Sequence, residues 1–231
     1  MRGSRIKYAC MNVHSIQIRK FKRLEKKLNR SNNPAAVVSL QETWTSAKSS
    51  VIQDIKSAGY RIIHKPRINQ QSGRGGGVAI ICFDSGVNFG PINLRYKPET
   101  LEYVVARVQT GKHSSRIINV YRPGGSKATS LFFSELEKLI KKVQYANEEV
   151  ILCGDLNVAL NRKSTNATVM KNLLVRCGLH QNVASPTHEK GGLLDLVCSQ
   201  NKTSVKVTEF NLPSDHCLLT WLPFAPQKKR K

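Results

Sequence analysis

The stretch VILCGDLNVAL, residues 150–160, determines how the rest of this chain is interpreted. Its apolar run ends at Gly154, and an acid and an amide follow two residues apart, Asp155 and Asn157. Side chains two residues apart in a strand point to the same side. Burying such a pair without partners is costly, whereas a strand that ends at a cleft leaves both groups free to act on a ligand. The stretch therefore predicts a strand over 149–155 that ends in a functional site.

Polar side chains stand at the ends of other short apolar runs as well. A single acid at a strand end is usually structural, but the repetition along one chain favours a shared site. The further positions are Asn12, Gln41, Glu42, Tyr121, Arg122, Asp195, Asp215 and His216.

These residue types suit metal-assisted hydrolysis of a phosphodiester. Mg²⁺ prefers carboxylate oxygens and keeps several waters, so Glu42 is a candidate ligand. A carboxylate such as Asp155 can take the proton of the attacking water. Polar donors such as His216 can stabilise the charge that develops on the phosphate oxygens. Asp195 is a candidate partner that would fix the tautomer of this imidazole and favour its charged form.

The charge of the chain indicates its partner. Lys and Arg number 37 against 15 Asp and Glu, which gives a net charge of +22 and a pI near 10.1. A surface this basic attracts polyanions, and nucleic acid is the usual one. An anionic membrane surface is the competing partner, but no basic amphipathic helix with a large apolar face supports it. No stretch approaches the roughly 20 apolar residues that span a bilayer.

Short strand-like runs alternate with amphipathic stretches, and there is no internal repeat or long linker. This pattern predicts one mixed α/β domain over 1–231, with a core over about 5–224 and a basic tail or linker at 225–231. Helices are expected around Phe21–Leu28, Val51–Ile55, Phe132–Val143 and Val169–Leu174. Strands are expected over 36–44, 76–83, 102–109, 116–122, 149–155, 193–199, 204–210 and 216–222.

The six cysteines have no zinc-like spacing, and most lie in apolar strand-like runs. A free cysteine in such a run acts as a small core residue. We therefore expect free thiols and a reducing compartment.

In order along the chain, MNVHS, SLQETW, NVYRP, CGDLN, LLDLV and SDH resemble the exonuclease–endonuclease–phosphatase superfamily, which includes pancreatic DNase and the apurinic endonucleases. The resemblance runs from about Asn12 to about Trp221, and GDLN followed by SDH roughly 60 residues later is specific in combination. It implies a four-layered α/β sandwich, the DNase-like fold, in which two mainly antiparallel β-sheets are flanked by helices. The site would lie at one edge.

The resemblance also implies the metal and phosphate contacts. Glu42 would be the metal ligand, with Asn12 near the metal and the phosphate. The metal would be Mg²⁺, for which Mn²⁺ can substitute. Tyr121 would contact the phosphate.

The remaining catalytic roles follow from the same resemblance. Asp155 would activate or position the water, and Asn157 would orient the water and the phosphate. Asp195 and His216 would form the carboxylate–imidazole pair. Asp215 would lie beside the metal or orient His216.

Four segments, QETW, GGGVAI, NVYRP and PTHEKGGLLDLV, are similar to the apurinic-type endonuclease domain of a non-LTR (LINE-type) retrotransposon. Such a domain nicks one strand of double-stranded DNA and leaves a 3′-hydroxyl that primes reverse transcription. The resemblance implies an excised domain, monomeric by itself and nuclear, that works with a downstream reverse transcriptase domain and the element RNA. No membrane partner is expected.

Thr187 matches a family position close to the DNA, and only seven residues separate it from Asp195. Relatives can carry a DNA-contacting hairpin in this interval. Its shortness here predicts modest specificity that rests on DNA shape and flexibility. Arg122 and Arg162 are candidate phosphate contacts.

Three further side chains are given structural roles. Trp44 is expected in the core, and His188 on the surface. His14 stands where some apurinic endonucleases carry an acid near a proposed second metal site, so a two-metal site is disfavoured.

Three alternatives remain open. A DNA-repair apurinic endonuclease fits the charge and the chemistry equally well, and activity on abasic against intact duplex would separate it. A non-catalytic DNA-binding domain of the same fold would be expected to have lost a ligand or a base, and none is lost. A phosphoinositide phosphatase or sphingomyelinase acts at membranes, which the strongly basic chain disfavours.

Overall fold

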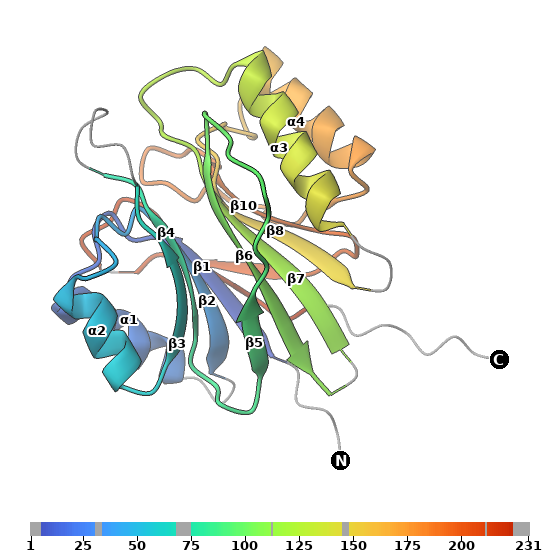
Figure 1. Cartoon of the computed structure of the whole chain (residues 1–231). Helices are drawn as coiled ribbons and strands as arrows, with labels where there is room; N and C mark the ends of the chain where they lie inside the picture. Colours follow the sequence, from blue (N-terminus) through green and yellow to red (C-terminus); the bar gives the residue numbers. More distant parts are fainter. Residues whose placement is uncertain are drawn as a thin grey trace.

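Two six-stranded β-sheets pack face to face and carry helices on their outer faces (Figure 1). The structure is a computed structural model that describes residues 6–30, 34–67, 75–111, 113–144, 148–210 and 212–223. The predicted four-layered α/β sandwich of two mainly antiparallel sheets is confirmed, and each sheet contains one parallel pair among its described pairings. None of the described helices is long and apolar enough to cross a membrane.

The first sheet combines strands from both ends of the chain. Helices α1 (Ile18–Asn29) and α2 (Ser50–Ser57) bury their apolar residues against its outer face. Only the β1–β2 pair is parallel among its described pairings. The strands, in spatial order, are β11 (Val205–Thr208), β12 (Leu218–Trp221), β1 (Lys7–Asn12), β2 (Ala35–Gln41), β4 (Val78–Cys82) and β3 (Arg61–Lys65).

The second sheet is built from the middle of the chain. Helices α3 (Ser130–Val143) and α4 (Thr165–Arg176) pack on its outer face. Its β7–β8 pair is parallel, and its other described pairs are antiparallel. The strands, in spatial order, are β5 (Asn88–Pro91), β6 (Glu102–Thr110), β7 (His113–Tyr121), β8 (Glu149–Asp155), β10 (Asp195–Ser199) and β9 (His180–Gln181).

Both helices on the second sheet begin at a side-chain cap. The hydroxyl of Thr129 accepts a hydrogen bond from the Phe132 N–H, and that of Ser164 accepts one from the Ala167 N–H. Each cap satisfies an amide that the first helical turn leaves without a partner, which typically contributes about 1 kcal/mol.

The two parallel pairs place polar strand ends at one edge of each sheet. Asn12 is paired with Gln41 at the end of β1 and β2. Tyr121 is paired with Asp155 at the end of β7 and β8. Strand β10 runs antiparallel to β8 and begins at this edge, so that Asp195 is the partner of Asp155. The predicted gathering of strand-end side chains is thus a result of strand direction.

All six cysteines lie among the described residues and all are free thiols, as predicted. Five of them are buried, and Cys217 is partly buried. Four of them lie in strands and act as small packing residues of the two sheets: Cys10, Cys82, Cys153 and Cys198.

A fully buried amide joins the two sheets across the core. Asn119 of β7 donates from Nδ2 to the backbone oxygens of Leu40 and Ala79, both at 2.9 Å. Its Oδ1 accepts a hydrogen bond from Nε2 of Gln41. Each polar atom of this side chain therefore has a partner, which is the condition for placing an amide in an apolar core.

We expect Asn119→Ala to lower the free energy of unfolding by about 1–3 kcal/mol, because it removes three buried hydrogen bonds, to Gln41 and to the backbone oxygens of Leu40 and Ala79. Equilibrium unfolding in urea measures the change. The matched control is Asn88→Ala, since Asn88 is exposed on β5, and it should stay within about 0.5 kcal/mol of wild type. Equal stability of the two variants would contradict the role given to Asn119.

Candidate active site

Asp155 lies at the centre of the polar edge, with its side chain almost completely buried. Its Oδ1 accepts a hydrogen bond from the Asn157 N–H at 3.0 Å. Its Oδ2 accepts from Nδ2 of Asn12 at 2.9 Å and from Nδ2 of Asn157 at 3.2 Å. Residues from both sheets therefore position one carboxylate.

The strand that delivers Asp155 requires a glycine just before it. Gly154 has φ +133°, and a Cβ at this position would lie 1.9 Å from the backbone oxygen of Val120 on β7. No side chain fits there. The glycine in CGDLN thus allows β8 to approach β7 closely at the site.

Strained backbone is concentrated at the same edge. Residues other than glycine seldom adopt left-handed φ values, and such strain is typical of functional sites. Among the described non-glycine residues, positive φ occurs at His14, Ser15, Glu42, Trp44 and Asn157.

Glu42 follows β2 and is partly exposed. Its Oε1 accepts a hydrogen bond from Nδ2 of Asn12 at 2.9 Å, and its Oε2 accepts one from Nε1 of Trp44 at 3.0 Å. Burial, followed by the charge and a hydrogen bond of Glu42, raises the pKa of Tyr121 far above its usual range. Tyr121 therefore keeps its proton and is a hydrogen-bond donor beside this carboxylate.

His216 and Asp195 form the predicted carboxylate–imidazole pair. Nδ1 of His216 lies 2.8 Å from Oδ2 of Asp195, and both side chains are buried. Burial lowers the pKa of His216, but the hydrogen bond and charge of Asp195 outweigh it, and with the charges of Asp155 and Asp215 they raise this pKa to about 9. The imidazole is therefore positively charged at neutral pH.

The pKa of the Asp155 carboxyl is also shifted, toward neutrality. Burial, followed by the negative charge of Asp195, raises the pKa of Asp155 well above its usual range, although the charge of His216 and two hydrogen bonds partly oppose this. Oδ2 of Asp155 lies 3.8 Å from Nε2 of His216. A carboxylate whose pKa lies closer to neutrality is a better general base.

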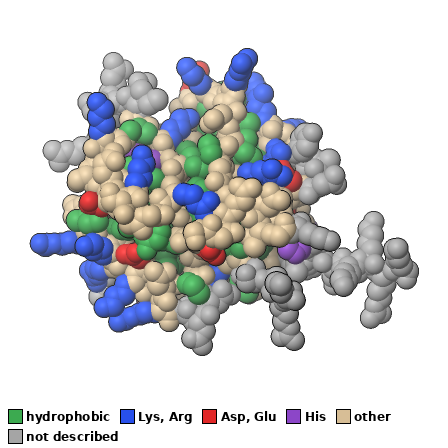
Figure 2. Space-filling model, turned by 60° about the horizontal axis from the view of Figure 1, so that its bottom comes forward, with side chains coloured by type: hydrophobic (Ala, Val, Ile, Leu, Met, Phe, Trp, Pro, Cys, Tyr) green, Lys and Arg blue, Asp and Glu red, His purple; other side chains and the backbone are tan. Residues whose placement is uncertain are grey.

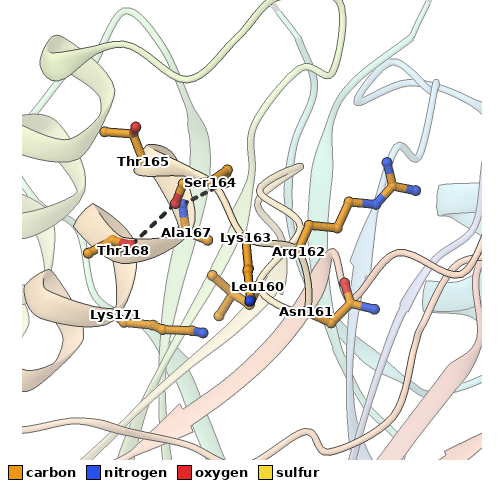
Figure 3. A pocket seen from close by; sticks show the side chains of 9 residues that line it. All are labelled: Leu160, Asn161, Arg162, Lys163, Ser164, Thr165, Ala167, Thr168 and Lys171. Carbon is orange, nitrogen blue, oxygen red and sulfur yellow. Dashed lines mark hydrogen bonds between the residues drawn. The ribbon is translucent and has the colours of Figure 1, made fainter.

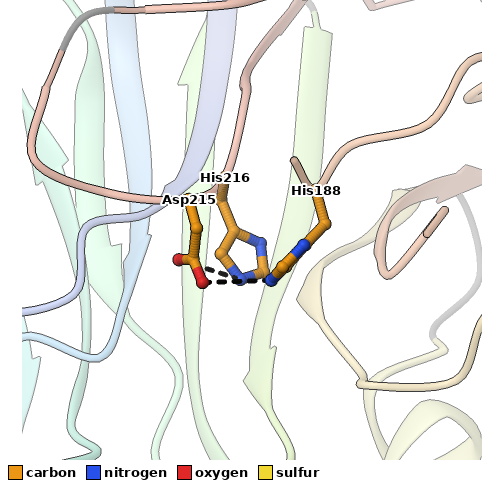
Figure 4. Close-up of side chains that lie close together, drawn as sticks. All are labelled: His188, Asp215 and His216. Carbon is orange, nitrogen blue, oxygen red and sulfur yellow. Dashed lines mark ion pairs between the residues drawn. The ribbon is translucent and has the colours of Figure 1, made fainter. Parts of the chain in front are cut away.

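Asp215 lies at the rim of the site among three imidazoles. Its Oδ2 is 3.0 Å from Nε2 of His188. Its Oδ1 is 3.8 Å both from Nε2 of His216 and from Nδ1 of His14. Figure 4 shows Asp215, His216 and His188 close together, with ion pairs from Asp215 to both imidazoles.

The donor set fits a hard divalent cation at Glu42. Asn12 Nδ2 donates both to Glu42 and to Asp155, so the two carboxylates lie close together. Mg²⁺ is bound by one or two carboxylates and otherwise by water and substrate phosphate. Asn12 itself presents N–H groups to the carboxylates, and its Oδ1 accepts from the His14 N–H at 3.0 Å. The site therefore favours Glu42 as a direct ligand and Asn12 as a residue that orients it.

Arg122 does not lie where the predicted phosphate contact requires it. It is buried, and its guanidinium donates at 2.8–2.9 Å to the backbone oxygens of Leu156, Pro123, Ser126 and Asn157. A buried guanidinium that makes four hydrogen bonds to the loops after β7 and β8 supports these loops and is not available to DNA.

Thr187 is also not placed where a DNA contact would require it. It is fully buried, and its hydroxyl accepts hydrogen bonds from the N–H groups of Leu194 and Asp195, both at 3.0 Å. Direct DNA contact, the role predicted for it, does not fit this position. Thr187 instead anchors the start of β10 and so positions Asp195.

Arg162 is exposed, as a phosphate contact requires, and its role stays a prediction. It lines an open hollow of about 580 Å³ at the start of α4, together with Lys163 and Lys171. Figure 3 shows the Arg162 side chain extending away from those of α4.

Two side chains differ from the sequence-based expectation. Trp44, expected in the core, is 38% exposed and donates to Glu42. His188, expected on the surface, has a side chain only 12% exposed and contacts Asp215. The adjacent motifs QETW and PTH were the available signals, but neither gives the direction of a side chain.

Comparison with solved structures shows the same fold in several nucleic-acid enzymes. A 3′ phosphatase, NExo, from Neisseria, bound to a product DNA hairpin, has a TM-score of 0.69 at 19% identity, covering 95% of this chain and 100% of that one. The endonuclease domain of TRAS1, a telomere-specific non-LTR retrotransposon, has a TM-score of 0.68 at 16% identity, covering 94% and 97%. The AP endonuclease LMAP from Leishmania major has a TM-score of 0.70 at 15% identity, covering 97% and 90%.

Among curated proteins, none matches this sequence at a significant level. Residues 12–216, however, match the sequence profile of the Endonuclease/Exonuclease/phosphatase family. This range runs from Asn12 to His216 and contains the whole constellation described above. The chain therefore belongs to the Endonuclease/Exonuclease/phosphatase family of hydrolytic nucleases and phosphatases.

Proposed function

We propose that this domain is a Mg²⁺-dependent DNA endonuclease that nicks one strand of double-stranded DNA. The nick leaves a 3′-hydroxyl that primes reverse transcription of a non-LTR, LINE-type retrotransposon. The observation that carries the nuclease proposal is the joint placement of Asp155, Asn157, Asp195 and His216 at the strand ends. It joins a buried base, an amide that orients it and a charged imidazole in one site.

Each group has a defined part in the hydrolysis. Asp155 takes a proton from the water whose oxygen attacks phosphorus, and the P–O3′ bond breaks. His216, kept protonated by Asp195, donates from Nε2 to a phosphate oxygen on which negative charge develops. Tyr121 is a further donor to the phosphate. Asn157, whose amide donates to Asp155 and to the backbone oxygen of Arg122, holds the base in place. The released 3′-oxygen takes a proton from solvent.

Glu42 would hold Mg²⁺, with Mn²⁺ as a substitute, and Asn12 and Trp44 would orient its carboxylate. The bound ion supplies positive charge that neutralises the phosphate during the reaction. The carboxylate-rich donor set is what such an oxygen-seeking cation prefers.

The surface charge supports DNA as the substrate. The net charge is +22, and Figure 2 shows a face from which Lys and Arg side chains project at many points while few acidic ones do. The hollow lined by Arg162, Lys163 and Lys171 adds a basic site near the start of α4. Such contacts bind phosphate and give affinity without sequence information.

The segment between Thr187 and Asp195 supports modest sequence specificity. The N–H groups of Thr187 and His188 both donate to the backbone oxygen of Gly192, at 2.9 and 3.1 Å, so the segment closes into a tight turn. A turn this short offers few side chains to a DNA groove. Target choice would then depend largely on DNA shape and flexibility.

The retrotransposon role is favoured over DNA repair by the motifs QETW and PTH, and the TRAS1 endonuclease domain has the same fold. The proposal includes a downstream reverse transcriptase domain, the element RNA, nuclear localisation and a monomeric domain. The alternative is an apurinic/apyrimidinic repair endonuclease, whose fold is shared as well.

The direct test is nicking of supercoiled plasmid in Mg²⁺. We expect Asp155→Asn and His216→Ala each to reduce the rate by about 10²–10⁴-fold, because each removes a proton-transfer or charge-stabilising group. EDTA should abolish nicking in the wild type. The matched control is His113→Ala, since His113 is exposed on β7, and it should keep full activity. Tight DNA binding without metal-dependent cleavage would leave a non-catalytic DNA-binding domain.

The products distinguish the two endonuclease roles. We expect 3′-hydroxyl and 5′-phosphate ends on intact duplex, and rates on intact DNA at least equal to those on a matched abasic duplex. Cleavage confined to the abasic duplex would replace the retrotransposon role with repair.

The basic limb of the pH–rate profile should depend on His216. Its pKa is raised to about 9 and its charged form is the active one, so kcat/KM should fall as the pH rises through about 9. Asp195→Asn removes the charge and weakens the hydrogen bond that raise this pKa, so the limb should move to lower pH. Asp54→Asn, an equal charge change on the exposed face of α2, should leave the limb in place. An unmoved limb in Asp195→Asn would show that the pair does not set the charge of His216.

A further inference from the structure

His188 connects the turn after Thr187 to the loop that carries Asp215 and His216. Its Nε2 lies 3.0 Å from Oδ2 of Asp215, and its ring meets the His216 ring edge-on at a centroid distance of 4.8 Å. Figure 4 shows the three side chains together. The proposed chemistry assigns no part to this imidazole.

The backbone fixes the tautomer of His188. The Lys190 N–H donates to Nδ1 of His188 at 3.0 Å. A nitrogen that accepts a hydrogen bond carries no proton, so the proton of the neutral ring is on Nε2. His188 therefore donates from Nε2 to Oδ2 of Asp215.

This tautomer argues against a metal site at the same place. His188, Asp215 and His216 are close enough to surround one cation. A metal ligand must offer a lone pair, and a protonated Nε2 has none. The geometry consequently assigns His188 to positioning Asp215 and not to ligation.

The position of Asp215 affects the catalytic imidazole directly. Its Oδ1 lies 3.8 Å from Nε2 of His216, just beyond hydrogen-bond distance. Without the hydrogen bond from His188, the Asp215 side chain would be free to rotate toward this charged nitrogen and form a charge-assisted hydrogen bond, which is among the strong ones. The Nε2–H of His216 would then face Asp215 in place of the phosphate.

The surrounding backbone holds the two loops together without the His188 side chain. The Glu189 N–H donates to the backbone oxygen of Asp215 at 2.9 Å, and the Cys217 N–H donates to the backbone oxygen of Thr187 at 2.7 Å. His188 and His216 also form an isolated antiparallel bridge. Substitution of the His188 side chain therefore leaves the loop geometry supported.

We propose that His188 is a positioning residue that holds Asp215 away from His216 and so keeps the catalytic imidazole available to the scissile phosphate. The catalytic consequence depends on the proposed nuclease function. The hydrogen bond and tautomer on which it is built do not.

The kinetic test compares His188→Ala with His188→Gln, whose side-chain amide can also donate to Asp215. We expect His188→Ala to lower the kcat for nicking of supercoiled plasmid by about tenfold. The KM should change less than twofold, since substrate binding is not the affected step. His188→Gln should recover kcat to within about threefold of wild type. In an Asp215→Ala background, His188→Ala should have no further effect, because the competing carboxylate is absent.

A spectroscopic test is independent of activity. The ¹H–¹⁵N spectrum of the histidine rings should show His188 as the neutral Nε2–H tautomer at pH 7.5, and His188→Ala should shift the ring signals of His216. Thermal unfolding of each variant checks that the fold is kept.

Three results would overturn the inference. One is an Nδ1–H tautomer for His188, and another is a kcat of His188→Ala within twofold of wild type. The third is stoichiometric Zn²⁺ binding, measured by calorimetry, that His188→Ala abolishes. A wild-type domain that fails to cleave DNA would remove the proposed function, and the tautomer and the His216 signals would still decide whether the His188–Asp215 contact exists.

Discussion

A carboxylate buried where two sheets meet is the constraint on which the rest of the site depends. Asp155 is 1% exposed and needs partners for both oxygens. Asn12 supplies one from the first sheet, and Asn157 supplies two from the loop after β8. Gly154 lets β8 approach β7 closely, and Arg122 holds the loop by donating to the Asn157 oxygen. Many residues at this edge therefore position one carboxylate, a group that proteins seldom bury.

Burial and the charge of Asp195 affect Asp155 and His216 differently. Low solvent exposure and a neighbouring acid raise the pKa of Asp155, while Asp195 keeps His216 charged. A carboxylate with a raised pKa and a charged imidazole thus lie 3.8 Å apart without a direct hydrogen bond between them. Each stays available to a third molecule, which a tight ion pair would prevent. At the rim of the site, His188 and Asp215 form a second imidazole–carboxylate contact.

Much of the fold was predictable, because hydrophobic runs ending in polar residues mark strands that reach a functional edge. The strand over Glu149–Asp155 is an example with identical bounds. Strands β3, β5 and β9 were not predicted: β3 is half-buried throughout, β5 contains Gly and Pro, and β9 has two residues. The roles of Arg122 and Thr187 depend on backbone groups that the fold places beside them. No spacing in the sequence reveals such partners, and charge alone made Arg122 resemble a DNA contact.

The site draws on residues that are far apart in the chain. Asn12 and Asp155 lie 143 positions apart in the sequence. The hydroxyl of Ser214 donates to the backbone oxygen of Asn12, which lies 202 positions away. Contacts of this range are made late in folding, because long loops must close first. During synthesis, β8 leaves the ribosome well before the imidazole of His216 exists. A growing chain therefore carries Asp155 without His216, and the group of side chains at the sheet edge is complete only when almost the whole sandwich has been made.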